Sequence, residues 1–260
     1  MNVIVCIKQV PRGSVCLDDR GILERSQSGG RLNPGDSYAL EAAMQIAETA
    51  GGQVTALTMG PESGAQILRT AFSVGVSHGV LVCDRAFAGA DVYATAYTLS
   101  QAIRQLPPFD VIVCGQQTAD GGTAQLPFSL AAQLGIPAVG WIKALEIREG
   151  QLILKQELSG GTQQAEPGTP CLLSVGAGIG SPRLPSLRGQ LKAKNAPIQV
   201  MSLKDLRDQD PLHYGLAGSC TRVTALQQLK REKKNAPIPL SGEGGAEKIL
   251  SLCREVKAYG

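Results

Sequence analysis

The sequence is poor in charged and aromatic residues and contains no long hydrophobic run. Charged residues make up 18% of its 260 residues and aromatic residues 4%, whereas typical domains carry about 25% charged residues. With 43% hydrophobic residues, the composition is unlike that of a disordered chain or a coiled coil. No apolar run approaches the roughly 20 residues that cross a bilayer, and the N-terminal MNVIVCIKQVPRG has no basic leading segment or cleavage site. We therefore expect a soluble, cytoplasmic protein without membrane insertion.

Motifs for metal binding and catalysis are absent as well. The seven cysteines form no CxxC pair and the two histidines, His78 and His213, lie near no plausible ligand cluster, so no metal site is expected. The sequence also lacks GxGxxG after its first apolar run, GxxxxGK[ST], HExxH and GxSxG. No general base is evident, so we assign no catalytic residue. These absences favour a protein that binds a nucleotide over a hydrolase.

Short apolar runs predict a parallel sheet. Four of them are β-branched and apolar at nearly every position, as strands buried on both faces must be. They occupy residues 3–7, 53–58, 79–83 and 110–114. Helical patterns lie between these runs, and the alternation predicts an α/β fold with a doubly wound, mostly parallel, Rossmann-like sheet.

Capping and helix-breaking residues mark the expected helix ends. Asp36 and Asp91 are expected to cap two of the helices, and Pro61 suits the first position of another. A further helix is expected to begin near Thr123 and to end at Gly135.

The pattern changes after residue 140. Two strand-like runs at 141–148 and 151–158 predict a hairpin that extends the sheet. A loop is expected at 159–170 and a last apolar strand at 171–175.

Regular periodicity fades from residue 176 onward, leaving weak helical patterns at 203–207 and 244–257. We expect residues 1–190 to form an adenine-nucleotide-binding domain. Residues 191–260 are expected to form an irregular C-terminal arm that a partner orders.

Charge divides the chain in a similar way. Residues 1–182 hold 11 Lys+Arg and 15 Asp+Glu, a net −4, whereas residues 183–260 hold 14 and 7, a net +7. Such an asymmetry suggests that the tail meets an acidic surface, although a solvated face explains it equally well. No aromatic residues interleave the basic ones, so nucleic acid is not the expected partner.

Glycines gather where the predicted strands end, which is where open parallel sheets bind ligands. The segment GQQTADGGTAQ at 115–125 has Gly121 and Gly122 just before a helix whose first turn must contain Pro127. Backbone N–H groups and the positive end of that helix predict a phosphate site. The alternative is a plain turn, since Gly-Gly before a helix is often only that.

Six segments together resemble one protein family, the beta subunit of electron transfer flavoprotein. The resemblance spans roughly residues 1–225, in order and with the spacing expected of that family. The segments are VIVCIKQVP at the start, LNPGDSYALEAA at 32–43, LTMGPESGAQILRTAFSVGV at 57–76, GADVYATAYTLSQAI at 89–103, CGQQTADGGTAQLP at 114–127 and SPRLPSLRGQLKAKN at 181–195.

The resemblance implies a heterodimer with an alpha subunit that holds FAD. Such a heterodimer passes electrons from a flavin dehydrogenase, for acyl-CoA or a similar substrate, to a downstream acceptor. The beta subunit would bind AMP, or a second FAD in the electron-bifurcating branch. The implied nucleotide contacts are Cys6, Asn33, Pro34, Gly35, Asp36, Met59, Gly115, Asp120, Gly121, Gly122, Thr123, Ala124 and Gln125.

Three stretches resemble the bifurcating branch more closely, namely 89–103, DGGTAQ at 120–125 and GLAGSCTRV at 215–223. In that branch Asp91 and Thr95 would approach the second flavin; as an alternative, both are ordinary residues of a helix N-terminus. Two positions depart from the bifurcating branch. Arg12-Gly13 follows Val-Pro, and Cys220 stands where a proline is usual. The choice between AMP and FAD therefore stays open.

The resemblance also places a docking loop for the dehydrogenase at 176–188, with Ile179 as its aliphatic anchor. Arg183 and Arg188, with Lys192 and Lys194 beyond them, would surround this loop with positive charge that steers an acidic partner. The alternative for Ile179 is a residue of the core.

A different kind of protein stays possible at this point. A stand-alone AMP or ATP sensor of the universal-stress type would use the same sheet without redox chemistry. Such a sensor would need neither the C-terminal arm nor the loop at 176–188.

Overall fold

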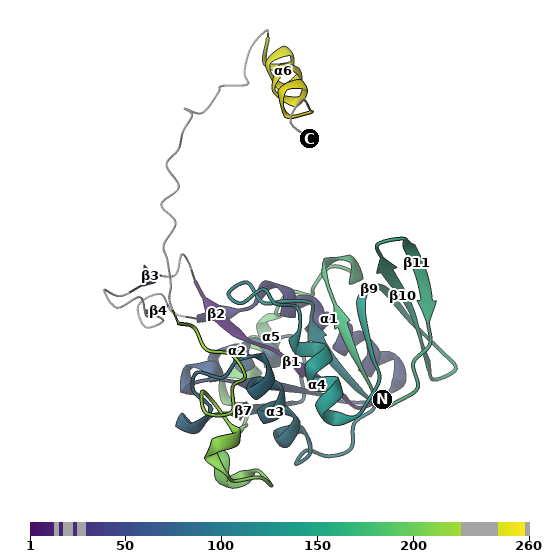
Figure 1. Cartoon of the computed structure of the whole chain (residues 1–260). Helices are drawn as coiled ribbons and strands as arrows, with labels where there is room; N and C mark the ends of the chain where they lie inside the picture. The colour runs from purple at the N-terminus through teal and green to yellow at the C-terminus, as the bar shows by residue number, and fades with distance from the viewer. Residues whose placement is uncertain (13–15, 18–22, 25–29, 225–243, 258–260) are drawn as a thin grey trace. The chain divides into compact units, whose positions relative to one another are not determined.

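The computed structural model describes residues 1–12, 16–17, 23–24, 30–224 and 244–257 (Figure 1). The chain divides into two compact units, Met1–Thr224 and Ala225–Gly260. In the second unit the described residues form α6 (Gly245–Lys257), which confirms the helical pattern expected at 244–257. All that follows concerns the first unit.

A nine-stranded sheet organises the described residues of this unit. Its order is β11-β10-β9-β12-β8-β1-β6-β7-β13, and every pair from β9 to β13 along this order is parallel, whereas β9, β10 and β11 pair antiparallel. The doubly wound, mostly parallel sheet with a hairpin extension is thereby confirmed. The strands are β1 (Val3–Cys6), β6 (Val54–Met59), β7 (His78–Val82), β8 (Val111–Gly115), β9 (Ala138–Arg148), β10 (Gln151–Leu158), β11 (Gly161–Ala165), β12 (Cys171–Val175) and β13 (Ile198–Met201). Smaller two-stranded sheets pair β2 (Gln9–Pro11) with β5 (Gly30–Leu32) and β3 (Cys16–Leu17) with β4 (Leu23–Glu24).

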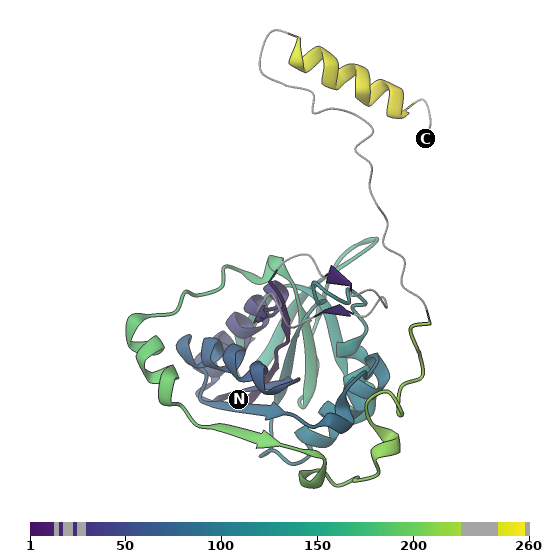
Figure 2. The ribbon, with the colours of Figure 1, turned by 90° about the vertical axis from the view of Figure 1, so that its left-hand side faces the viewer.

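Helices cover both faces of the sheet, as Figures 1 and 2 show. One core cluster joins α1, α2 and α5 to one face, and a second joins α3 and α4 to the other. The helices are α1 (Pro34–Ala50), α2 (Ala65–Ser73), α3 (Val92–Ile103), α4 (Leu126–Leu134) and α5 (Leu187–Asn195), with single 3-10 turns η1 (Glu62–Gly64), η2 (Arg85–Phe87), η3 (Ala177–Ile179), η4 (Leu203–Asp205) and η5 (Pro211–His213).

The strand β1 shows why continuous apolar runs form the centre of this sheet. Val3 and Val5 contact the first core cluster, and Ile4 and Cys6 contact the second. Successive side chains point to opposite faces of a strand, and here both faces are buried, so no position along β1 tolerates a polar side chain cheaply.

Three of the four predicted helix starts need correction. Pro61 precedes the 3-10 turn η1 as its N-cap and is not the first residue of a helix. Asp91 caps α3 as expected, because its Oδ1 accepts from the Ala94 N–H at 3.0 Å. Asp36 does not cap α1: Asn33 occupies the N-cap position, and Asp36 lies within the first turn. The helix expected near Thr123 begins at Leu126, since Ala124 has a φ of 55° that no helix accommodates.

The segment after residue 158 is more regular than its sequence indicates. The loop expected at 159–170 contains β11, which pairs with β10. The segment expected to be irregular from residue 191 contains most of α5 and all of β13, which adds an edge to the sheet beside β7. The boundary expected at residue 190 therefore falls inside the compact unit, which runs to Thr224.

No helix among the described residues combines the length and the apolar character needed to cross a membrane.

Candidate functional site

The strand order reverses between β1 and β8. From β1 the chain builds the sheet outward through β6 and β7 on one side, and β8 and β12 lie on the other. Loops that leave the carboxyl ends of β1 and β8 diverge here, which is where doubly wound sheets bind ligands.

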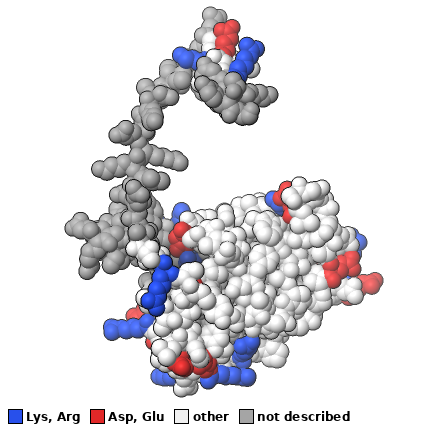
Figure 3. All heavy atoms as spheres, viewed as in Figure 1, with Lys and Arg blue, Asp and Glu red and all other residues white. Residues whose placement is uncertain are grey.

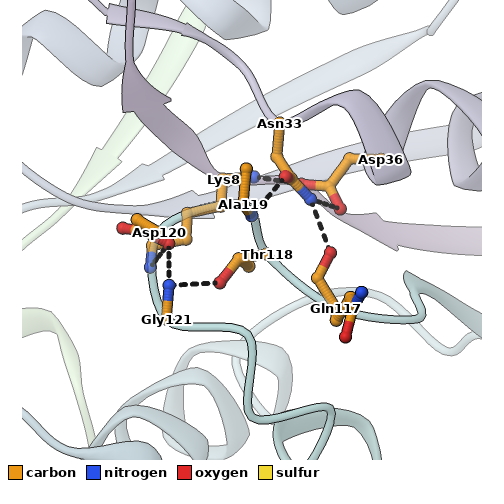
Figure 4. A network of polar contacts seen from close by, with 8 residues as sticks. All are labelled: Lys8, Asn33, Asp36, Gln117, Thr118, Ala119, Asp120 and Gly121. Carbon is orange, nitrogen blue, oxygen red and sulfur yellow. Dashed lines mark hydrogen bonds and ion pairs between the residues drawn. The ribbon is translucent and has the colours of Figure 1, made fainter. Parts of the chain in front are cut away.

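Asn33 is the centre of a buried polar network at this point (Figure 4). Its Nδ2 donates to Asp36 Oδ1 at 2.8 Å and to the carbonyl of Gln117 at 3.0 Å. Its Oδ1 accepts from the N–H of Ala119 at 3.0 Å. Asn33 is 1% exposed, so water does not compete with its side chain for these hydrogen bonds. Asn33 thus ties the start of α1 to the loop that follows β8.

Asp36 ties the same helix to the end of β1. Its Oδ2 accepts from the backbone N–H of Lys8 at 2.7 Å, and a side chain at Gly115 would collide with its carboxylate. Burial raises the pKa of Asp36 to about 7, although the hydrogen bonds from Asn33 and Lys8 lower it. Asn33 and Asp36 therefore hold two loops in place through hydrogen bonds with backbone groups of those loops.

Lys8 and Asp120 form the charged edge of the network. Lys8 Nζ lies 2.8 Å from Asp120 Oδ1, and the two side chains are 42% and 18% exposed. Burial alone would raise the pKa of Asp120, but hydrogen bonds from Lys8 and Thr118 and the charge of Lys8 outweigh it, so this pKa is lowered. The ammonium of Lys8 is thus held beside the glycine turn while still reaching solvent.

The glycine turn uses its first two N–H groups internally. Gly121 donates to Asp120 Oδ1 at 2.8 Å, and Gly122, with a φ of 59°, donates to the carbonyl of Thr118 at 2.9 Å. Among the described residues, the N–H groups of Thr123 and Ala124 have no hydrogen-bond acceptor. The donors available to an anion are therefore those after the two glycines.

Four further predicted residues border this turn. Pro127 is the second residue of α4, as expected, and Gln125 immediately precedes the helix. Pro34 and Gly35 open α1, and the Gly35 backbone lies against the carbonyl of Gln117. The structure thus brings the predicted segments 33–36 and 115–125 together.

Cys6 and Met59 are the last residues of β1 and β6. Cys6 is buried in the second core cluster beside Cys114, and the hydrogen bond of the Cys114 thiol with Cys6, together with burial, raises the pKa of Cys114 well above its ordinary value. Met59 is half-buried against the same cluster. Both side chains therefore pack with the apolar core on that face of the sheet.

Asp91 and Thr95 lie apart from this network, at the start of α3. The carboxylate of Asp91 accepts from the N–H and the hydroxyl of Thr221, both at 2.9 Å. The backbone N–H of Asp91 donates to Ser219 Oγ at 2.9 Å. The backbone N–H of Thr95 donates to the carbonyl of Asp91 at 2.9 Å. Burial would raise the pKa of Asp91, but the bonds from Ala94 and Thr221 lower it. Two of the stretches singled out in the sequence, 89–103 and 215–223, therefore meet here.

Within the segment 176–188, η3 and Arg183 contact α1, whereas Leu187 and Arg188 begin α5, which packs against α2. Ile179 is half-buried against the first core cluster. Arg183 is bound to carboxylates of α1, whereas Arg188 is exposed on α5. The most exposed aliphatic side chains of the segment are Leu184, at 87%, and Leu187, at 76%.

Sequence reasoning singled out neither Lys8 nor Glu41, and within the predicted segment 115–125 it did not identify the hydrogen bonds between the 117–119 backbone and Asn33. Lys8 directly follows an apolar strand, and that position was a usable signal for a residue at the strand end. Glu41 is 7% exposed although its spacing places it on the polar side of α1. Among the residues that the structure describes, no group of three or more His, Cys, Asp or Glu side chains is arranged to hold a metal ion.

The fold places the chain in the doubly wound α/β class, with a polar network at the switch point of the sheet. The sequence profile of one family, the Electron transfer flavoprotein domain, matches residues 20–206. The chain is 39% identical over 236 residues to the electron transfer flavoprotein subunit beta of Thermoanaerobacterium thermosaccharolyticum, covering 90% of each chain. It is 36% identical over 261 residues to the acryloyl-CoA reductase electron transfer subunit gamma of Anaerotignum propionicum, covering 97% of this chain and 96% of the relative. It is 34% identical over 226 residues to subunit CarD of the caffeyl-CoA reductase-Etf complex of Acetobacterium woodii, covering 86% of each.

The chain therefore belongs to the electron transfer flavoprotein family, and several of its relatives are named as beta subunits. Its general role is electron transfer. The comparisons give no support to the alternative of a stand-alone adenine-nucleotide sensor. The cytoplasmic location stays a prediction.

Proposed function

We propose that this chain is the beta subunit of a heterodimeric electron transfer flavoprotein that holds AMP or a second FAD at the carboxyl ends of β1 and β8. With an FAD-bearing alpha subunit it would pass electrons from a flavin dehydrogenase to a downstream acceptor. The observation that carries the nucleotide site is the polar network at the switch point, with a partly exposed ammonium and, at one turn, N–H donors that have no acceptor within the described part of the chain.

These groups suit a phosphate. The Lys8 ammonium supplies positive charge, the N–H groups of Thr123 and Ala124 supply donors, and the N-terminus of α4 adds a positive dipole end. Asn33 and Asp36 would keep the two loops at the separation that the phosphate requires. A bound FAD would supply two-electron chemistry, whereas AMP would supply none. In either case this chain's own residues bind and orient and perform no acid–base catalysis.

The surface is suited to a partner subunit. Charged side chains are sparse on the face seen in Figure 3, and exposed apolar side chains include Trp141 of β9, at 42%, and Leu158 of β10, at 44%. Depletion of charge together with exposed aromatic residues is typical of interface cores. Two of the relatives are named as subunits of reductase assemblies, one for acryloyl-CoA and one for caffeyl-CoA, which supports an alpha subunit and a flavin dehydrogenase as partners here.

A second FAD, and with it NADH-dependent electron bifurcation, is the finer proposal. It is supported by the meeting of segments 89–103 and 215–223, where Thr221 fixes the Asp91 carboxylate at the start of α3. A flavin beside α3 would need this tail segment in place, because the segment forms part of the surroundings of Asp91.

The experiment is to co-express the chain with its alpha subunit, purify the heterodimer, denature it and chromatograph the released cofactors. One FAD with one AMP per heterodimer would support an ordinary carrier. Two FAD would support bifurcation. Release of no adenine nucleotide beyond the alpha subunit's FAD would rule out the nucleotide site in this chain.

A further inference from the structure

Arg183 makes a network of contacts that leaves little of its charge for a partner. Its backbone N–H and its Nε donate to Glu41 Oε2 at 3.0 and 2.8 Å, and its Nη2 donates to Glu41 Oε1 at 3.1 Å. Its Nη1 and Nη2 also donate to the two carboxylate oxygens of Glu48 at 2.6 and 3.1 Å. All three guanidinium nitrogens are thus directed at α1, in the paired geometry that makes Arg–carboxylate contacts strong.

Glu41 is placed to receive this arginine. Its side chain is 9% exposed, against 30% for Arg183 and 54% for Glu48. Gln45, one turn further along α1, donates to Glu41 Oε1 at 2.9 Å. The hydrogen bonds from Arg183 lower the pKa of Glu41 despite its burial, and the two glutamates raise the pKa of Arg183. Removal of the arginine would leave a carboxylate in a largely dry place, which is strongly unfavourable.

The helix that carries both glutamates begins at the polar network. Asn33 and Asp36 open α1, and Glu41 and Glu48 follow one and three turns later. The ion pairs therefore join residues 142 and 135 positions apart in the sequence, and they attach the segment 176–188 to the same rigid element that anchors the switch-point loops.

We propose that Arg183 is a positioning residue, which fixes the segment 176–188 on α1 so that Leu184 and Leu187 face the partner. It acts through Glu41 and Glu48 and does not itself meet the dehydrogenase. This inference rests on the proposed function for the identity of the partner. The chemistry fits an apolar recess with an acidic rim, because Leu184 and Leu187, 87% and 76% exposed, are followed in the chain by the exposed Arg188.

Glu41→Gln separates this proposal from electrostatic steering by Arg183, because the two make opposite predictions. If Arg183 steers an acidic partner, removal of a neighbouring negative charge leaves the loop more positive and speeds association. If Arg183 positions the loop, the same substitution loosens it and slows association. A positioning effect also persists at high salt, whereas steering is screened.

The test measures the second-order rate at which a flavin dehydrogenase reduces the heterodimer, at low and at high salt. We expect Arg183→Gln, Glu41→Gln and the double variant each to slow the reaction by about five- to tenfold, without adding, at both salt concentrations. Arg188→Gln is the matched charge control, and its effect should disappear at high salt. A Glu41→Gln heterodimer that reacts as fast as the parent, or faster, would overturn the proposal.

A second readout does not depend on the partner. Limited trypsin digestion should cleave after Arg188 faster in Glu41→Gln than in the parent chain, although every trypsin site is the same in both. An unchanged cleavage rate would also refute the proposal that Arg183 fixes the segment 176–188 on α1. If the parent heterodimer is reduced by no flavin dehydrogenase, the proposed function fails, and the digestion still decides whether Arg183 holds the segment.

Discussion

The buried carboxyl group of Asp36 should make the stability of the chain depend on pH in a particular direction. Its pKa is raised from 3.8 to about 7. Below about pH 4 the group is protonated in both the folded and the unfolded chain, and above about pH 7 it is ionised in both. Between these limits the folded chain keeps the proton and the unfolded chain does not. The free energy of unfolding should therefore fall as the pH rises from about 4 to about 7.

The size of the effect follows from the same two values. At about 1.4 kcal/mol per pH unit, the loss between pH 4 and pH 7 is on the order of 4 kcal/mol. This is a large fraction of the 5 to 15 kcal/mol that holds a typical domain together. The two hydrogen bonds that Asp36 accepts, from Lys8 at 2.7 Å and from Asn33 at 2.8 Å, are already included in that pKa.

The assay is urea unfolding of the full chain at several pH values, followed by the fluorescence of Trp141, the one tryptophan of the sequence. Asp36→Asn removes the titration and leaves a similar shape, so the difference between parent and variant isolates Asp36. We expect the parent to lose stability relative to Asp36→Asn between pH 4 and pH 7. Asp120→Asn is a control of opposite sign, because the pKa of Asp120 is lowered and its contribution is lost only as the pH falls. A parent-minus-Asp36→Asn difference that does not change with pH would refute the reasoning.

Three further predictions concern the site and the loop. Gly122→Val should abolish nucleotide retention because Gly122 has a φ of 59°, whereas Gly122→Asn should keep it, since asparagine tolerates that region; equal retention in the two variants, measured by chromatography of released nucleotide, would show that the turn does not cradle the phosphate. Lys8→Met should weaken nucleotide binding by about tenfold and Lys155→Met, on an exposed position of β10, should not; calorimetric titration of the nucleotide-free chain with AMP decides between them. Ile179→Ala should slow reduction by the dehydrogenase without changing bound nucleotide, and a lower melting temperature with unchanged reduction kinetics would instead make it a core residue.

The parallel strands could be predicted from the sequence because their environment is uniform. A strand such as β8 is buried on both faces, so every residue from Val111 to Cys114 is apolar and the run is continuous. β11 carries no comparable signal. Its sequence GTQQA is exposed at the edge of the sheet, and β10 pairs with it through the backbone. α5 buries only Ala193, so its sequence shows no apolar stripe, and its position depends on α2 and on the preceding loop.

The site was predicted in part for a related reason. Turn glycines and strand ends are local features, and they identified the segment 115–125. The hydrogen bonds of Asn33 are not local, since its partner Ala119 lies 86 residues away. No spacing rule relates such residues, and an asparagine before a Pro-Gly pair is typical of any helix start. The role of Asp36 was misjudged for this reason, because its carboxylate accepts from the Lys8 backbone and the Asn33 side chain and not from the first N–H groups of α1.

The net charge counted from the sequence of the tail differs from the charge that the folded surface presents. Residues 183–260 carry a net +7, and the count includes Arg183 as a free positive charge near the loop. In the structure this guanidinium lies within 3.1 Å of two carboxylates, so its field at the surface is largely cancelled. The exposed cations that remain on α5 are Arg188, Lys192 and Lys194, and they should account for the salt dependence of partner association. The electrostatic field that a partner meets is therefore set by the cations that the fold leaves unpaired. Arg183, the first cation of the tail in the sequence, holds the loop in its conformation and adds little charge to that surface.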